Sequence, residues 1–231
     1  MGAVAVIPAR GGSQRIPRKN VRPFRGRPII AWSIEAALAS GCFERVVVST
    51  DDDEIAEVAE AAGAEVPFRR PAALADHHAG TDAVLLHALE TLAEGGVAPE
   101  HACCLYATAP FVTAQLVREG LDVLVRSGAG AAFTVTKFEF PIRRGLRLAA
   151  DGRLEMLWPE HRMTRSQDLE PAYHDAGQLY WVDVARFRAT PDVMQLAPVA
   201  IPVPRHRVQD IDDLEDWRRA ELLHAALDPG A

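Results

Sequence analysis

The residues with the clearest chemical potential lie together near the N-terminus, in segment 9–20. Gly11 and Gly12 directly follow an apolar run there. Glycine backbones can turn several N–H groups toward one point and so cradle phosphate oxygens. Arg10 and Lys19 flank the pair and can neutralise a polyphosphate, arginine with its planar fork and lysine as a point charge. The segment therefore predicts a phosphate-binding loop, with a plain turn on a solvated basic surface as the alternative.

The distribution of charge points to the same segment. The chain of 231 residues has a net charge of −7, which argues against a general affinity for nucleic acid. One short stretch nevertheless holds seven cationic side chains and no acidic one: Arg10, Arg15, Arg18, Lys19, Arg22, Arg25 and Arg27. An acidic protein that concentrates positive charge in this way is expected to bind a small polyanion there. The stretch has neither the Gly-Lys-Ser/Thr of a P-loop nor the G-x-G-x-x-G of a dinucleotide site.

A second candidate site lies near the C-terminus. Asp210 and Asp212 are spaced i and i+2, so on an extended segment both carboxylates point the same way and can share a Mg²⁺ ion. A cation held there would neutralise phosphate charge during group transfer. Alternatively, Asp212 and Glu215 form a capping box at the start of a final helix. The spacing alone leaves both interpretations open.

Alternating strand and helix patterns must position these residues. Buried strands are expected at 4–8, 45–49, 65–68, 102–107, 131–136, 178–182 and 199–203. Helices are expected at 28–39, from an Asp51–Glu54 capping box to Gly63, from Thr81 as N-cap, at 115–126, and from about Asp212 onward. This order predicts a mostly parallel α/β sheet with helices on both faces. Ligands of such sheets bind at the carboxyl ends of the strands, where the glycine loop lies.

Segment 137–170 interrupts the alternation with several prolines and glycines, which predicts a small β-rich insert of hairpins. Its apolar residues, such as Phe138, Phe140 and Ile142, would need cover. A symmetric homodimer would provide that cover.

Size and composition limit the remaining possibilities. The length and the 48% hydrophobic content suit one domain over residues 1–231. The N-terminal apolar run lacks the flanks of a secretory signal, and no apolar run is long enough to span a membrane. Cys42, Cys103 and Cys104 are an odd set in which two lie in a strand-like stretch, so buried reduced thiols are expected. We therefore expect a cytoplasmic protein with neither a membrane nor a nucleic acid as partner.

Segment 7–20 resembles the signature of the CMP-sugar synthetases, the cytidylyltransferases that activate sialic acids and related ulosonic acids. Further segments resemble family motifs in the same order, at 49–51, 70–87, 107–110 and 210–212. The resemblance implies a Rossmann-like nucleotidyltransferase fold with a dimerisation insert, placed here at about 137–170. It also implies the reaction, in which the sugar C2 hydroxyl attacks the α-phosphorus of CTP and releases pyrophosphate, with Mg²⁺ as cofactor.

The resemblance also assigns roles to individual residues. It implies nucleotide binding by Ala9, Arg10, Gly11, Gly12, Ser13, Lys19, Arg70, Thr81 and Asp82. It implies sugar binding by Tyr106, Thr108, Arg165, Gln167, Tyr173 and His174. Arg10, Lys19, Asp210 and Asp212 are the expected catalytic residues, and the two aspartates are the expected metal ligands. Alternatives remain for two of these residues, because Arg70 also suits a surface position and Asp82 suits the first turn of a helix on electrostatic grounds alone.

Three departures from the family pattern bear on the substrate. Gln14 stands where the family commonly has Lys, Tyr106 where a Gln is usual, and His174 where an Arg is expected. The last two changes remove hydrogen-bonding groups and suit a less hydroxylated acidic sugar. Segments 103–111, 166–170 and 173–178 resemble the family members that act on pseudaminic acid, which is therefore the expected substrate. The alternatives are N-acetylneuraminic, legionaminic or Kdo-type acids, or a catalytically silent sugar-nucleotide-binding protein.

Overall fold

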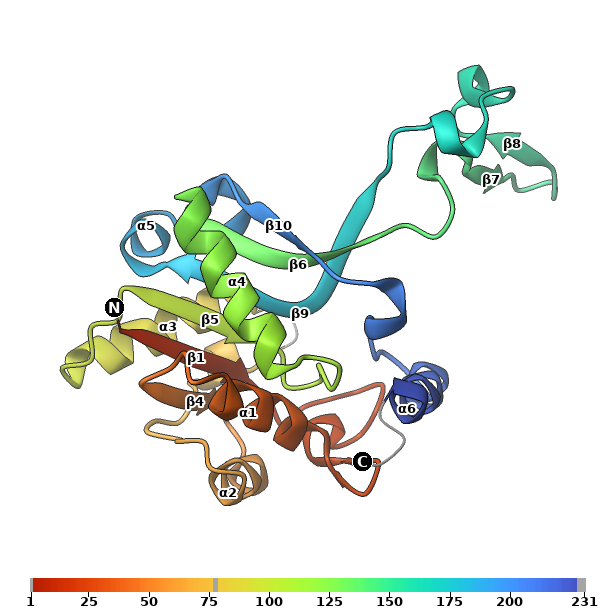
Figure 1. The fold of residues 1–231 in the computed structure, drawn as a ribbon. Coiled ribbons are helices and arrows are strands. Elements are labelled where there is room, and N and C mark those ends of the chain that lie inside the picture. The colour runs from red at the N-terminus through yellow and green to blue at the C-terminus, as the bar shows by residue number, and fades with distance from the viewer. Residues whose placement is uncertain (1, 77–78, 228–231) are drawn as a thin grey trace.

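A six-stranded β-sheet forms the centre of the computed structural model, which describes residues 2–76 and 79–227 (Figure 1). The strand order is β10-β6-β9-β5-β1-β4. The strands are β1 Ala3–Pro8, β4 Arg45–Ser49, β5 His101–Leu105, β6 Ala131–Lys137, β9 Tyr173–Asp183 and β10 Val199–Pro202. Pairing is parallel for β1 with β4, β1 with β5, and β6 with β10, whereas β9 pairs antiparallel with β5 and β6. The expected mostly parallel α/β fold is confirmed, with β9 reversed.

Strand β1 explains why its sequence is a continuous apolar run. Val4 and Val6 belong to the hydrophobic layer on one face of the sheet, and Ala5 and Ile7 to the layer on the other. Each of these four side chains is completely buried. A parallel strand with helices on both faces has no solvent side, so both alternating sets of residues are apolar.

Helices cover both faces of the sheet (Figure 1). Buried residues of α1, α2 and α4 join the layer that contains Ile7, whereas those of α3 and α5 join the layer that contains Val6. The helices are α1 Ile29–Ser40, α2 Asp53–Ala61, α3 Thr81–Glu94, α4 Ala114–Ser127, α5 Val184–Ala189 and α6 Leu214–Leu227. Short 3₁₀ turns lie at Lys19–Val21, Ala72–Leu74, Ile142–Arg144, Pro159–His161, Ser166–Asp168, Val193–Leu196 and Arg205–Arg207.

The C-terminal helix α6 lies beside the N-terminal part of the chain. Its residues Trp217 and Ala220 are buried in a separate cluster with Ile16, Phe24 and Ile29. Phe24 belongs to a short antiparallel hairpin of two-residue strands, β2 Pro23–Phe24 and β3 Arg27–Pro28. This cluster fixes segment 210–212 next to the loop that follows β1, although nearly 200 residues separate the two in sequence.

Three local predictions are wrong. Residues 65–68 do not form a strand, and Glu65 makes only an isolated bridge to Val47, since the following Pro67 has no N–H to donate to a ladder. Thr81 is the first residue of α3 rather than its cap, and Gly80 holds the cap position. Helix α2 is capped by Asp52, whose side chain accepts from the Ile55 amide, because the helix begins later than expected.

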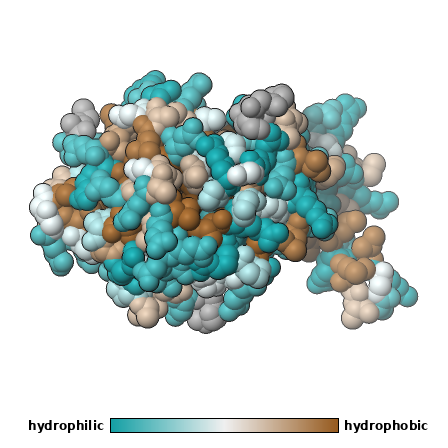
Figure 2. Space-filling view, turned by 90° about the horizontal axis from the view of Figure 1, so that it is seen from below, coloured by the Kyte–Doolittle hydropathy of each residue, from teal (hydrophilic) through white to brown (hydrophobic). Residues whose placement is uncertain are grey.

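Segment 138–172 projects from the sheet as an arm (Figure 1). It contains the antiparallel pair β7 Leu146–Leu148 and β8 Leu154–Met156, as the predicted β-rich insert requires. Strand β9 continues from the centre of the sheet toward the arm and is six residues longer than the segment 178–182 predicted. Several large apolar side chains of the arm are exposed, including Phe140 at 76%, Leu148 at 70% and Met163 at 85%. Hydrophobic surface is visible on the projecting part at the right of Figure 2.

The cysteines are free thiols, as their number and placement in the sequence predict. Cys103 and Cys104 are buried in β5 and are free thiols, as is the partly buried Cys42. Burial raises the pKa of both β5 thiols, so they are unreactive. Among the described residues no helix is long and apolar enough to cross a membrane.

Candidate functional site

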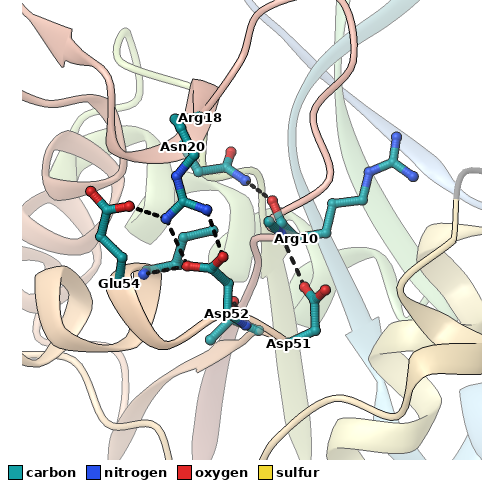
Figure 3. Close-up of polar contacts among 9 residues, drawn as sticks. Arg10, Arg18, Asn20, Asp51, Asp52 and Glu54 are labelled. Carbon is teal, nitrogen blue, oxygen red and sulfur yellow. Dashed lines mark hydrogen bonds and ion pairs between the residues drawn. The ribbon is translucent and has the colours of Figure 1, made fainter.

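The loop after β1 packs against the residues that follow β4 (Figure 3). The Gly11 amide donates to Asp51 Oδ1 at 3.0 Å, so a carboxylate lies against the backbone that was predicted to hold phosphate. A Cβ atom on Gly11 would lie 2.6 Å from Asp52 Oδ2, which explains why glycine is needed at this position. The same atom on Gly12 would meet nothing within 4 Å, so Gly12 is not required by space.

An ion-pair clamp holds the far end of this loop. The Arg18 guanidinium donates to both oxygens of Asp52, at 2.5 and 2.8 Å, and also to Glu54 (Figure 3). Arg18 has the left-handed φ of 56°, which is uncommon for a residue with a Cβ. The hydrogen bonds from Arg18 hold the pKa of Asp52 at about 2. Asp52 therefore caps α2 and fixes the loop at the same time.

A cleft of about 300 Å³ lies between this loop, α3 and the carboxyl end of β5. We call it the basic cleft. It brings together these predicted site residues: Arg10, Ser13, Lys19, Arg70, Thr81, Tyr106, Thr108 and Asp212. They come from five separate segments of the chain, which the fold brings together around one cleft.

Lys19 lies close to the two C-terminal carboxylates. Its Nζ donates to the Ile211 carbonyl at 2.6 Å, and its positive charge is attracted by both Asp210 and Asp212. Burial lowers the pKa of Lys19, and the two aspartates oppose that shift. The pKa of Asp210 is raised because protein atoms displace water around its carboxylate and because Asp212 is close. Arg15 forms a 2.8 Å ion pair with Asp212.

The capping alternative for Asp212 is not what the structure shows. Asp213 accepts from the amides of Glu215 and Asp216 and so caps α6. The helix starts one residue later than the proposed capping box requires. The Asp212 carboxylate faces the basic cleft instead.

Arg70 and Arg10 also line the basic cleft. The Arg70 side chain is buried, and its guanidinium donates to the hydroxyl and the carbonyl of Ser49, so the surface alternative is wrong for it. Burial lowers the pKa of Arg70. The Arg10 carbonyl accepts from the Asn20 side chain at 2.9 Å, while the Arg10 guanidinium points away from the clamp and donates to the Asp76 carbonyl at 2.7 Å (Figure 3). Both cations are thus oriented by backbone and hydroxyl contacts.

A second pocket, here called the adjoining pocket, shares Tyr106 with the basic cleft. Its volume is about 650 Å³, and its lining includes His174, Asp210 and Arg219. Asp210 and Asp212, only two residues apart, therefore face two neighbouring pockets. A smaller apolar cavity of about 230 Å³ lies beside both and is lined by Leu85, Phe133, Val193 and Met194 among others.

Two tyrosines lie where these spaces meet: Tyr106 lines all three, and Tyr180 lines the adjoining pocket and the apolar cavity. The Tyr106 hydroxyl hydrogen bonds with Thr81 Oγ1 at 3.1 Å, and the Tyr180 hydroxyl donates to Asp175 Oδ2 at 2.7 Å. The two rings pack with centroids 5.2 Å apart. Burial raises the pKa of both tyrosines, so both stay protonated at neutral pH.

Not every predicted residue lines the basic cleft. Ala9 is buried, and its amide donates to the Ser49 carbonyl. Asp82 lines the apolar cavity and accepts from the Val193 amide at 3.4 Å, while burial raises its pKa. Arg165 and Gln167 lie at a 3₁₀ turn of the arm, and Tyr173 is half exposed where the arm meets β9.

Sequence reasoning missed several residues that line these spaces. Arg15 and Arg18 were noted only as part of a basic run, although each proves to be paired with a specific aspartate. Asp175 and Arg219 were not selected at all. The signal for Asp175 was its place beside His174, but nothing local marked Arg219, because only tertiary structure brings α6 to the adjoining pocket.

The aspartate pair suits a divalent cation that shares its coordination with a substrate. Among residues 2–76 and 79–227, no cluster of three or more His, Cys, Asp or Glu side chains could hold a metal alone. Mg²⁺ is commonly held by one or two carboxylates, with phosphate and water oxygens completing the octahedron. Asp210 and Asp212 supply two such oxygens beside a cationic cleft, so the residues present fit Mg²⁺.

Comparison with known proteins agrees with this geometry. The pattern of the family described as cytidylyltransferase matches residues 4–180. A pseudaminic acid cytidylyltransferase of Campylobacter jejuni is 40% identical over 224 residues, 97% of each chain. A CMP-N,N'-diacetyllegionaminic acid synthase of Legionella pneumophila is 39% identical over 53% of each chain.

The fold has a solved counterpart. A CMP:2-keto-3-deoxy-manno-octonic acid synthetase, solved in complex with CTP, superimposes with a TM-score of 0.71 at 19% identity, covering 98% of this chain and 100% of that one. The match of fold agrees with the match of sequence, which covers nearly the whole chain. The chain belongs to the cytidylyltransferase family and is a nucleotidyltransferase.

Proposed function

We propose that the protein transfers the cytidylyl group of CTP to pseudaminic acid and forms CMP-pseudaminic acid and pyrophosphate. The observation that carries the proposal is the placement of Asp210 and Asp212, which face two adjoining pockets while Lys19 lies close to both carboxylates. One pocket is rich in cations and the other has room for a sugar, so the reacting groups of two substrates meet at the aspartates. The near full-length similarity to the Campylobacter enzyme supports the choice of substrate.

The basic cleft is the proposed CTP site. Arg10, Lys19 and Arg70 neutralise the triphosphate, and the Ser13 hydroxyl and backbone orient it. The Gly11 amide exchanges its contact with Asp51 for a phosphate oxygen, a better acceptor in a site rich in cations. Thr81 lines the cleft and holds the Tyr106 hydroxyl, whereas Ala9, Gly12 and Asp82 lie outside its lining and support it through the loop backbone and through the Val193 amide.

Asp210 and Asp212 are the proposed Mg²⁺ ligands. The cation, when bound, neutralises charge that develops on the phosphate oxygens and lowers the cost of deprotonating the sugar hydroxyl. The sugar C2 hydroxyl loses its proton to solvent and its oxygen forms a bond to the α-phosphorus. The bond from that phosphorus to the bridging oxygen breaks, and pyrophosphate leaves with the electron pair. Lys19 and Arg10 hold the leaving group. Removal of one positioned charge of this kind typically slows an enzyme by about 10²–10³-fold.

The adjoining pocket is the proposed sugar site. Tyr106 lies at its border with the basic cleft, Thr108 lies on the basic-cleft side, and His174 lines the adjoining pocket itself. The apolar cavity beside it can bury an acetyl or methyl substituent, which a sugar with acylamido groups and a terminal methyl offers. Pseudaminic and legionaminic acids both have these substituents, and the extent of sequence similarity favours pseudaminic acid.

We also propose a homodimer in which the arm of each subunit reaches its partner. The exposed apolar side chains of the arm need cover, and the arm's Arg165 and Gln167 lie away from the pockets of their own chain. In a symmetric dimer the partner would bury the apolar side chains of the arm, and Arg165 and Gln167 would reach the partner's sugar site. Tyr173, at the base of the arm, is a further proposed sugar contact. Free buried thiols suit the reducing cytoplasm, where we place the protein.

The direct test is pyrophosphate release from CTP and Mg²⁺, with and without an acidic sugar. The proposal predicts release only when the sugar is present, together with one equivalent of CMP-sugar detected by mass spectrometry. UTP, GTP and ATP should give little product. Tight CTP binding without any turnover across a panel of nonulosonic acids would favour a silent sugar-nucleotide-binding protein instead.

A further inference from the structure

The adjoining pocket must provide a partner for the sugar's carboxylate. An ulosonic acid carries this group on C1, next to the C2 that reacts, so the carboxylate must lie close to Asp210. Two acidic side chains, Asp175 and Asp210, line the pocket. An anion placed between them needs a cation or several donors to offset their repulsion.

His174 is poorly suited to supply those donors. Its Nδ1 lies 2.8 Å from the Asp175 carbonyl oxygen. A carbonyl can only accept, so Nδ1 carries the hydrogen, and in the neutral ring Nε2 is an acceptor. The ring is also held by an edge contact with Phe138, at a centroid distance of 4.8 Å. In its neutral form His174 therefore has no further N–H to offer a carboxylate.

Arg219 has the chemistry that His174 lacks. It lies on α6 and lines the adjoining pocket. Among the described residues it makes no hydrogen bond or ion pair, so its five N–H donors are available. Other arginines near the two pockets, such as Arg15 and Arg18, are instead held by carboxylates.

Helix α6 also fixes where Arg219 lies. Trp217 and Ala220, on either side of Arg219 in sequence, are buried in the cluster beneath the helix. The same helix follows directly after Asp210 and Asp212, and the Asp216 carboxylate accepts from the Asp212 amide at 3.0 Å. Helix α6 therefore fixes the position of Arg219 relative to the proposed metal ligands Asp210 and Asp212.

From these contacts we infer that the Arg219 guanidinium binds the C1 carboxylate of the acidic sugar through bidentate hydrogen bonds, and so orients the C2 hydroxyl toward CTP. This inference rests on the proposed function and names the residue that recognises the acid. The planar fork matches a carboxylate in a way that a lysine ammonium does not. Arg219 is thus a substrate-binding residue that determines specificity for acids.

The test compares two substrates in two enzymes. The substrates are pseudaminic acid and its 1-carboxamide, which has the same shape without the charge. Wild-type enzyme should strongly prefer the acid. Arg219→Gln should raise the KM for the acid by about 30-fold or more, while it changes kcat/KM for the amide little. Arg219→Lys should retain part of the preference. The KM for CTP should stay unchanged in both variants.

Arg218→Ala is the matched control, because Arg218 is the exposed neighbour on α6 and does not line the pocket. It should keep the wild-type preference for the acid. A loss of equal size for acid and amide in Arg219→Gln would show a structural role and overturn the inference. If wild-type enzyme turned over no acidic sugar at all, the proposed function itself would fail, which the same assay shows separately.

Discussion

Asp210 and Asp212 place two negative charges on one short segment, and the raised pKa of Asp210 records the cost. Burial is the larger cause and repulsion from Asp212 the second. Lys19 offsets part of the cost, yet its own pKa is lowered by burial. The protein can fold with these partly buried charges, and a bound divalent cation would neutralise the charge of the two carboxylates. Perturbed groups of this kind cluster at functional sites.

Neutral replacements at the pair should therefore affect activity more than folding. Asp210→Asn and Asp212→Asn should each lower kcat by about 100-fold or more, because each removes an oxygen charge that holds the cation. Asp210→Asn should not lower the melting temperature, since it relieves repulsion, and Asp212→Asn should lower it only slightly, since it loses an exposed ion pair with Arg15. Asp213→Asn is the control, because asparagine caps a helix as well as aspartate does. Near-normal rates for both variants with a chelator present would exclude the metal site.

The Arg18–Asp52 clamp makes a prediction about pH. The pKa of Asp52 in the folded protein is lowered to about 2 from an ordinary value of 3.8. A lowered carboxyl pKa adds stability above the unfolded value, and that stability is lost as the pH falls from about 4 toward 2. Asp52→Asn keeps the helix cap but loses the charge, so it should lower the unfolding free energy at pH 7 by about 1–2 kcal/mol.

Chemical denaturation across this pH range checks the clamp. The difference in unfolding free energy between wild type and Asp52→Asn should be constant from pH 5 to 8 and shrink below pH 4. A difference that persists unchanged at pH 2.5, or that is absent at pH 7, would show that the ion pair does not stabilise the loop.

At the scale of elements, the loop after β1 depends on one glycine more than on the other. Gly11→Ala should push Asp52 out of its contact with Arg18 and lower the unfolding free energy by about 1–3 kcal/mol. Gly12→Ala has open space and should change the same quantity by less than about 0.5 kcal/mol. Urea denaturation of both variants measures the contrast. Equal losses of stability would mean that Asp52 does not restrict the backbone here.

Elements with local signals were predictable, and those set by distant contacts were not. Strand β4 and the ends of α1 and α4 follow from an apolar run and from glycines after each helix. The length of β9 was missed because residues 173–175 pair with distant β6. Asp51 was preferred over Asp52 as a cap because both suit the position, and only the Arg18 clamp and the Gly11 amide decide between them.

In the candidate site, too, the residues that lie in recognisable motifs were predictable and those placed only by tertiary packing were not. Arg10, Lys19 and Asp212 carry motifs that resemble a known family, and the fold brings them together. Arg219 carries no motif, since an isolated arginine on a helix is ordinary. Its place in the adjoining pocket follows from the packing of α6, which the sequence pattern does not specify.

At the scale of the whole molecule, the arm predicts oligomerisation. Light scattering should report a homodimer at micromolar concentration, because the exposed apolar residues of the arm need a partner. Phe140→Glu with Leu148→Glu should produce a monomer. Leu222→Glu, an equally exposed leucine on α6, is the control and should remain dimeric. A wild-type monomer would contradict the proposed assembly.

The dimer also predicts complementation between inactive variants. Arg165→Ala removes a proposed sugar contact supplied by the partner, and Asp212→Asn disables the site within its own chain. Mixed subunits should recover about a quarter of wild-type activity, since half of the dimers then hold one intact site. No recovery after confirmed subunit exchange would show that Arg165 does not act across the interface.

The most direct test of the central claim is kcat/KM with CTP for pseudaminic, legionaminic and N-acetylneuraminic acids, each measured under the same conditions. The account predicts a value for pseudaminic acid at least about tenfold above that for N-acetylneuraminic acid, a gap of about 1.4 kcal/mol in transition-state binding. Legionaminic acid should fall below pseudaminic acid. Equal values, or a preference for N-acetylneuraminic acid, would contradict the assignment of the adjoining pocket and the apolar cavity to a sugar with acylamido and methyl groups.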